Sequence, residues 1–200
     1  MASRIDEVLS RIASLEHELE AELNQARARW RYRLDAGRVR FDRDVRQAHQ
    51  RLKQSIPRFI RESSLANVLT APVVYSLVVP IAIVDAWVSL YQAICFRAYG
   101  ITRVRRSAYI VLDRQQLSYL NTFEKLNCMY CGYANGVLAY VREVAGRTEQ
   151  YWCPIRHAHR VRGPHRQYRH FVDYGDAEGY RRRLIPLRKE LTDEPPAGDH

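Results

Sequence analysis

Residues 128–157, CMYCGYANGVLAYVREVAGRTEQYWCPIRH, organise the rest of the chain. Cys128 and Cys131 stand three residues apart before a glycine, a spacing typical of a tight turn whose two thiols grip one metal ion. Cys153 and His157 follow, and on a helical turn residues i and i+4 share a face. Together the four side chains form a Cys3His set, which is a common tetrahedral zinc combination.

The residues between the two half-sites allow both to reach one ion. Asn135 is expected to cap a helix of about 11 residues and roughly 17 Å, and Gly146 is expected to end it. The linkers on either side reach roughly 30 Å when extended. The alternative to a metal site is a set of ordinary buried cysteines beside a surface histidine. Rival ligands are His159, His165, His170 and the spare thiol of Cys95.

The run NCMYCGYANGVLAYVREVAGRTEQYWCPIRHA, with the apolar stretch before it, resembles a family of uncharacterised bacterial membrane-associated proteins. The resemblance covers residues 65–190 and implies a membrane location, but no mechanism, because no activity is established for that family. The C-x-x-C-G-Y turn is also similar to a rubredoxin knuckle. Where rubredoxin has the last cysteine of its second knuckle, this chain has a histidine further along, which departs from a rubredoxin iron site.

The composition indicates which partners suit the chain. Its 200 residues include 32 Lys and Arg against 22 Asp and Glu, a net charge of +10. This balance favours anionic partners such as phospholipid head groups, nucleic acid or an acidic protein. Four cysteines without a recognisable signal peptide fit a reducing compartment better than a disulfide scaffold.

Residues 3–61 are expected to form long helix, because apolar residues recur at steps of mostly three and four from Ile5 to Phe59. The narrow seam favours a coiled coil or a helical hairpin bent near Gly37, and hence self-association; a single surface helix is the alternative. Within it, residues 27–33 alternate arginine with other residues, aromatic ones among them. On a helix this period spreads the arginines around the axis, so nucleic-acid binding is not favoured.

Residues 65–96, LANVLTAPVVYSLVVPIAIVDAWVSLYQAICF, hold one charged residue, Asp85. As a helix, residues 68–96 would be roughly 43 Å long against about 30 Å of hydrocarbon, too short for two spans. Pro72 and Pro80 interrupt it. Arginines flank both ends equally, so the positive-inside rule gives no orientation. A re-entrant hairpin near Pro80 is favoured because it keeps both termini in the cytoplasm; one tilted span and a buried core helix are the alternatives.

Asp85 is expected to have a role, because a charge in a membrane segment is costly. It would pair with an arginine of a partner or bind a proton, unless it lies at a hydrated turn. Further on, Asp113 is expected to cap a helix that leads to Cys128. A last helix is expected to begin near Asp176, and residues 193–200 are expected to be disordered.

These elements predict a mainly α chain in four regions: a coiled-coil-like region 1–62, a membrane-embedded segment 65–97, a small α-rich metal-binding domain 98–192, and the tail. The favoured function is a scaffold or subunit at the inner membrane, with both termini in the cytoplasm, structural zinc, a homo-oligomeric state and a further protein partner. One alternative is a membrane-bound redox or thiol protein using iron, or Cys153 with His157 as base. Another is a basic zinc module that binds nucleic acid. A closed four-ligand site leaves no position for substrate, so catalysis is not expected.

Overall fold

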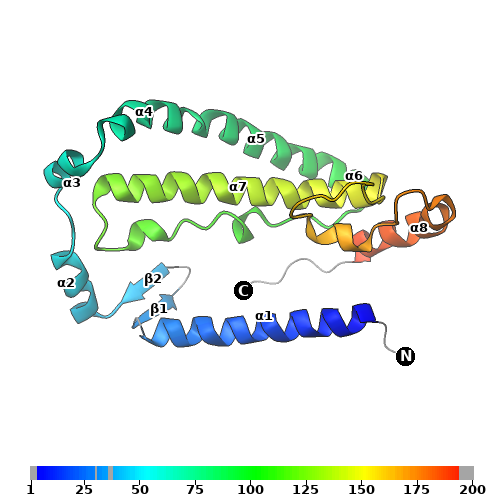
Figure 1. Cartoon of the computed structure of the whole chain (residues 1–200), viewed down its shortest axis with the longest axis horizontal. Coiled ribbons are helices and arrows are strands. Elements are labelled where there is room, and N and C mark those ends of the chain that lie inside the picture. Colours follow the sequence, from blue (N-terminus) through cyan, green and yellow to red (C-terminus); the bar gives the residue numbers. More distant parts are fainter. Residues whose placement is uncertain (1–3, 30, 36–37, 194–200) are drawn as a thin grey trace. The chain divides into compact units, whose positions relative to one another are not determined.

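The structure is a computed structural model that describes residues 4–29, 31–35 and 38–193 and is mainly helical. The predicted disordered tail falls, from residue 194 on, outside these described residues. The chain divides into two compact units, one of residues 1–61 with 113–125 and the other of residues 62–112 with 126–200. Figure 1 shows the elements of each unit.

A β-hairpin separates the helices of the first unit. Helix α1 spans Arg4–Arg29, strands β1 and β2 span Tyr32–Asp35 and Arg38–Phe41, and helices α2 and α3 span Arg43–Arg51 and Ile56–Glu62. The strands are antiparallel, with Tyr32 opposite Phe41 and Leu34 opposite Val39. The expectation that residues 3–61 are helical, apart from a bend near Gly37, is therefore wrong at the two strands, and Gly37 itself lies outside the described residues. In the hairpin, apolar and charged residues alternate with the period of two that favours strands.

Ion pairs and ring contacts hold the first unit together. Arg31, at φ 52°, donates to Asp42 at 3.1 Å and to Asp44 at 2.6 Å, which ties the start of the hairpin to the start of α2. The ring of His49 meets those of Phe41 and Tyr119 edge-on, at 5.1 and 5.2 Å between centroids. A contact between α2 and residue 119 therefore brings a distant segment of the sequence into the first unit.

The second unit begins with one long helical run from Leu65 to Tyr99, here called the apolar helix. It consists of α4 (Leu65–Ser76), α5 (Val78–Tyr91), a π-helical turn (Gln92–Phe96) and α6 (Arg97–Tyr99). The hairpin expected near Pro80 is wrong, because the helix continues through that residue, which lies in the first turn of α5. The run ends at Gly100, whose φ of 71° is typical of a residue that follows a helix.

Helix α7, Thr122–Trp152, runs beside α4 and α5 in the same direction (Figure 1). The Tyr75 hydroxyl binds Asn127 near one end, and the hydroxyls of Tyr91 and Thr148 are 3.0 Å apart near the other. Residues 100–112, here called the return segment, lead from the end of the apolar helix back toward the start of α7. They are largely irregular, with one 3-10 turn at Arg106–Ala108. This arrangement leaves one long side of the apolar helix covered by protein.

The boundaries of α7 differ from the prediction. Asn121 and Glu124 form a reciprocal cap: Asn121 Oδ1 accepts the Glu124 amide at 3.0 Å, and Glu124 Oε2 accepts the Asn121 amide at 2.7 Å. Asp113, the expected cap, instead precedes a short 3-10 turn at Arg114–Gln116. Asn135 and Gly146, the expected cap and stop, both lie inside α7, so those two expectations are wrong as well.

Glycines inside α7 lie where other chain segments approach it closely. A Cβ built on Gly136 would be 2.7 Å from the Tyr109 carbonyl oxygen and 2.9 Å from Ile110 Cα, both in the return segment. A Cβ on Gly146 would be 2.7 Å from the ring of His165. A glycine inside a helix costs about 1 kcal/mol relative to alanine, and here the close contact of a second segment explains its presence.

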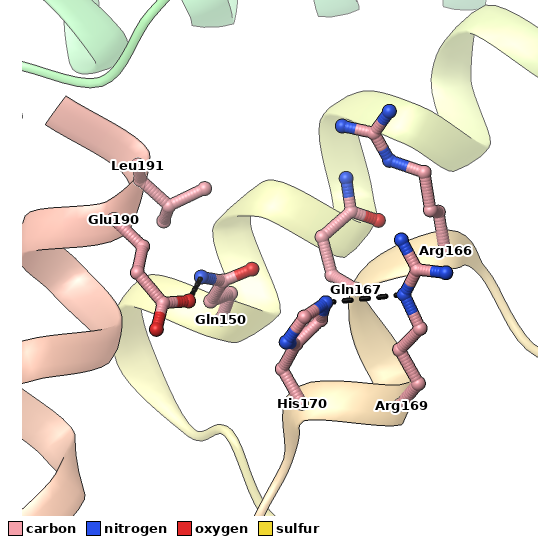
Figure 2. A pocket seen from close by; sticks show the side chains of 7 residues that line it. All are labelled: Gln150, Arg166, Gln167, Arg169, His170, Glu190 and Leu191. Carbon is pink, nitrogen blue, oxygen red and sulfur yellow. Dashed lines mark hydrogen bonds between the residues drawn. The ribbon is translucent and has the colours of Figure 1, made fainter. Parts of the chain in front are cut away.

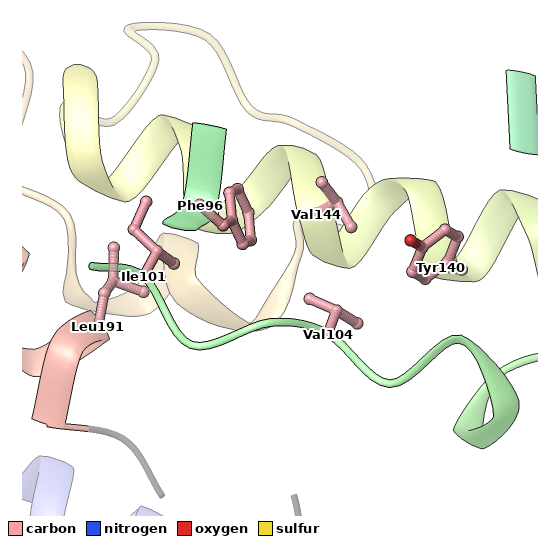
Figure 3. Packing of buried hydrophobic residues seen from close by; sticks show 6 residues of the cluster. All are labelled: Phe96, Ile101, Val104, Tyr140, Val144 and Leu191. Atoms are coloured by element: carbon pink, nitrogen blue, oxygen red, sulfur yellow. The ribbon is translucent and has the colours of Figure 1, made fainter. Parts of the chain in front are cut away.

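The buried core lies where the end of the apolar helix, the return segment, α7 and α8 meet (Figure 3). Its members are Phe96, Ile101, Val104, Tyr140, Val144 and Leu191. Helix α8 spans Ala177–Asp193, close to the predicted start, and the Asp176 carboxylate accepts the Gly179 amide at 2.8 Å. Leu187 and Leu191 of this helix are buried, and Tyr180 and Leu184 are half-buried.

Candidate functional site

The four predicted zinc ligands lie at two separate places. Cys128 and Cys131 are inside α7, while Cys153 and His157 follow its end. At about 1.5 Å of rise per helical residue, Cys131 and Cys153 are more than about 30 Å apart, whereas zinc ligands lie about 2.0–2.3 Å from the ion. No group of three or more His, Cys, Asp or Glu residues could hold a metal within the described ranges. The four residues thus do not fit one common ion in this fold, and zinc, with iron as its alternative, remains a prediction from the sequence.

His157 makes other contacts, and Cys153 is an exposed residue. The His157 ring stacks on Tyr168 at 6.1 Å between centroids, and its backbone amide donates to the Tyr168 hydroxyl at 2.8 Å. Partial desolvation, together with the Glu149 carboxylate nearby, raises the pKa of the Cys153 thiol. A raised pKa leaves less thiolate at neutral pH, and the thiolate is the reactive form. This geometry gives no support to a nucleophilic Cys153 activated by His157.

Two of the rival histidines, His165 and His170, belong to polar contacts near the C-terminal end of α7, whereas His159 is exposed. His165 Nε2 is 2.7 Å from Glu149 Oε2, and its Nδ1 is 3.2 Å from Gln167 Oε1. Gln167 donates in turn to the Glu143 carboxylate at 2.7 Å, and Glu143 pairs with Arg147 at 3.0 Å. The chain of contacts is mostly buried and joins the loop after α7 back to the helix. Its tight pairing explains how two charged residues are accommodated inside the fold.

His170 lines a small polar cavity of about 130 Å³ with Arg169, Gln150 and Glu190 (Figure 2). Arg169 Nε donates to His170 Nε2 at 3.1 Å, and Gln150 donates to Glu190 at 3.4 Å. Burial, and secondarily the charge of Arg169, lower the pKa of His170. A lowered pKa favours the neutral form of this ring at neutral pH. The charges at the cavity are those of its partner Arg169 and of Arg166 and Glu190.

The apolar helix presents a long aliphatic surface that the described chain does not cover. In its most apolar 18-residue window only 6 % of the residues are buried, and it is the one described helix long and apolar enough to cross a membrane by length and composition. The large exposed side chains of this helix are Leu65, Val68, Leu69, Val73, Val74, Leu77, Val78, Val79, Ile83, Val84, Trp87, Leu90 and Ile94. Burying one such side chain fully stabilises a protein by about 1.5–3 kcal/mol, so this surface is costly to leave in water.

Several polar groups of the same helix are buried or are bonded within the helix. Asp85 and Gln92 are buried, and Gln92 binds both the amide and the carbonyl of Val104 in the return segment, at 3.0 and 3.2 Å. Thr70 donates to the Ala66 carbonyl at 2.8 Å, and Ser76 donates to that of Val73 at 2.7 Å. Polar groups inward and aliphatic groups outward are the reverse of a soluble helix.

Asp85 is held by an arginine of its own chain. Arg106 donates from Nε to Oδ1 at 2.8 Å and from Nη2 to Oδ2 at 2.6 Å, and the Tyr133 hydroxyl donates to Oδ2 at 2.9 Å. The Asp85 side chain is 8 % exposed, whereas that of Arg106 is 47 % exposed. The expected charge partner was therefore the right residue type, although it comes from the return segment and not from another protein.

The sequence analysis identified the apolar helix and Asp85, but it did not predict the residues that contact Asp85, which are Tyr133 and Arg106 of the return segment. Tyr133 and the return segment carry no pattern that marks them as partners of Asp85, apart from the arginines that follow the apolar stretch. Comparison of the chain with protein-family models, characterised proteins and solved structures finds no match, so its function is argued from its own residues.

Proposed function

We propose that this chain is a membrane-associated scaffold or subunit protein whose apolar helix embeds in the surface of a lipid bilayer. The observation that carries the proposal is the reversed polarity of that helix. Exposed aliphatic patches of this size mark protein or membrane contacts. A bilayer is favoured because the exposed hydroxyl groups of Thr70 and Ser76 bind carbonyls of the helix itself, as hydrocarbon requires.

An in-plane position fits the charges better than a span. Arg106 lies on the covered side, midway along the apolar helix through its bond to Asp85, and nearly half of its side chain is exposed. An arginine at the centre of a bilayer costs at least about 2.5–3.5 kcal/mol. With the helix parallel to the membrane plane, the aliphatic side contacts acyl chains and Arg106 stays among head groups or water. Both termini then remain on one side, which we propose to be the cytoplasmic side of the inner membrane.

Vesicle flotation tests the embedding. We expect the full-length chain to float with phospholipid vesicles, because transfer of the aliphatic side from water is favourable. The variant Ile83→Asp, which places a carboxylate on that side, is expected to stay in the aqueous fraction. Tyr174→Asp is the matched control, since Tyr174 is 71 % exposed but lies outside the helix. Equal flotation of Ile83→Asp and the unchanged chain would contradict the proposal.

We also propose that α1 mediates self-association. Leu15, Leu19 and Leu23 recur every four residues and are 55, 60 and 49 % exposed, so the apolar seam has no cover among the described residues. A second copy of the helix would bury it as in a coiled coil. Replacing the three leucines by serine is expected to lower the native mass of the purified protein to that of a smaller oligomer or a monomer. An unchanged native mass by light scattering would show that the seam does not join the copies.

A further inference from the structure

Two hollows adjoin Phe41 in the first unit, and they differ in character. The aromatic hollow, of about 480 Å³, is lined by Tyr32, Phe41, His49, Leu52, Leu117 and Tyr119. The cationic hollow, of about 760 Å³, is lined by Arg40, Arg46, Lys53 and Lys125 together with Val39, Phe41, Gln50, Gln116 and Ser118. Both lie in the range of volumes typical of small-molecule sites.

The cationic hollow gathers charge of one sign from separate elements. Arg40 comes from β2, Arg46 from α2, Lys53 from the chain after α2, and Lys125 from the first turn of α7. Among the described residues that line the hollow, none carries a carboxylate. The side chains of Arg46, Lys53 and Lys125 have no hydrogen-bond or ion-pair partner in the described part of the chain. Like charges around one hollow repel one another, and a multiply charged anion relieves that repulsion.

The aromatic hollow contains a polar atom that lacks a partner. His49 Nδ1 is buried and makes no hydrogen bond, and the Ser118 hydroxyl in the cationic hollow is in the same state. A buried polar atom without a partner is costly, and a ligand that bonds to it removes the cost. An acyl chain could fill an apolar hollow but could not bond to His49. A heteroaromatic ring can do both, because its faces contact aromatic side chains and its edge carries donors and acceptors.

We propose that these hollows form one binding site for a nucleotide, with the base in the aromatic hollow and the phosphates in the cationic hollow. The chemistry suits a free nucleotide or one nucleotide of a single strand. The frame for it is built by the fold: the Val39 amide donates to Gln116 Oε1 at 2.7 Å, which joins β2 to the segment that leads to α7. The hairpin matters here, because it places Phe41 in the lining of both hollows and Arg40 in the lining of the cationic hollow.

Isothermal titration of the full-length protein with ATP, tripolyphosphate and a short oligouridine tests the site. We expect saturable binding of ATP, at least about tenfold tighter than of tripolyphosphate, because only ATP offers a base. Tighter binding of the oligouridine than of ATP would assign the site to a strand, and the reverse order to a free nucleotide. Equal affinity for ATP and tripolyphosphate, or no saturable binding of either nucleotide at millimolar concentration, would overturn the proposal.

Two variants separate the roles of the hollows. Arg46→Gln/Lys53→Gln/Lys125→Gln is expected to weaken ATP binding more than about tenfold and to flatten its dependence on salt. The control Arg181→Gln/Arg182→Gln/Lys189→Gln removes the same charge from α8 and is expected to bind as the unchanged chain does. His49→Phe keeps a ring but removes the polar atom, so the preference for ATP over tripolyphosphate should fall. Equal losses in both triple variants would mean that net charge alone attracts the ligand.

Discussion

Gly136→Ala is expected to destabilise the second unit by about 1–3 kcal/mol, which is the usual cost of overpacking. The new methyl group would lie 2.7 Å from the Tyr109 carbonyl oxygen and 2.9 Å from Ile110 Cα. Both atoms belong to the backbone of the return segment, so no side-chain rotation relieves the contact. The segment must shift, and it carries Arg106, the partner of Asp85.

Gly132→Ala is the matched control for this change. Its Cβ would meet Leu112 Cδ2 at 3.4 Å and the Val111 carbonyl oxygen at 3.5 Å, which are ordinary contact distances. Because alanine favours helix over glycine by about 1 kcal/mol, this variant is expected to be neutral or more stable. Denaturant unfolding followed by circular dichroism measures both. Equal midpoints for the two variants would show that the return segment does not press against α7 at Gly136.

The cysteine motif predicted a tight turn at Cys128 and Cys131, but the structure has a helix there. The C-x-x-C-G-Y spacing is typical of a metal-binding turn, and Gly132 supported that interpretation. In the structure the same residues continue a helix, and Gly136 allows the close approach of a second segment. Nothing local distinguishes the two uses, because the deciding contact comes from residues 109–112.

The N-terminal region shows a different failure. Apolar steps of three and four predicted helix across residues 3–61. The residues from Tyr32 to Phe41, however, alternate with a period of two. The arginine alternation of residues 27–33 is a separate pattern, which begins in α1 and ends in β1. The period of a short segment should therefore be judged by itself.

The sequence predicted correctly the features that depend on long apolar patterns. The mainly helical class, the apolar stretch with Asp85 inside it and the last helix with its buried leucines are all present. Features that depend on contacts between distant segments could not be predicted. The contacts of Glu143 with Gln167, of Glu149 with His165 and of Asp85 with Arg106 are examples, since each joins residues more than a helix turn apart.

Asp85→Asn is expected to destabilise the fold by about 1–3 kcal/mol. The change keeps the shape of the side chain but removes the negative charge that accepts two bonds from Arg106 and one from Tyr133. Removing one partner of a fully buried ion pair costs about 3–5 kcal/mol. Because Arg106 is 47 % exposed and water screens its charge, the smaller figure applies here.

A double-mutant cycle with Arg106→Gln separates the pair from its surroundings. We expect the two single changes to be non-additive by about 1–2 kcal/mol, since the second removes a partner that is already lost. Asp173→Asn is the matched control: Asp173 also pairs with an arginine, Arg156, at 2.8 Å, but is 77 % exposed, so its loss should cost less than about 1 kcal/mol. If Asp85→Asn costs no more than Asp173→Asn in the same unfolding measurement, the charge at Asp85 does not fasten the return segment to the apolar helix. Its inward position would then reflect only the exclusion of a polar group from the aliphatic side.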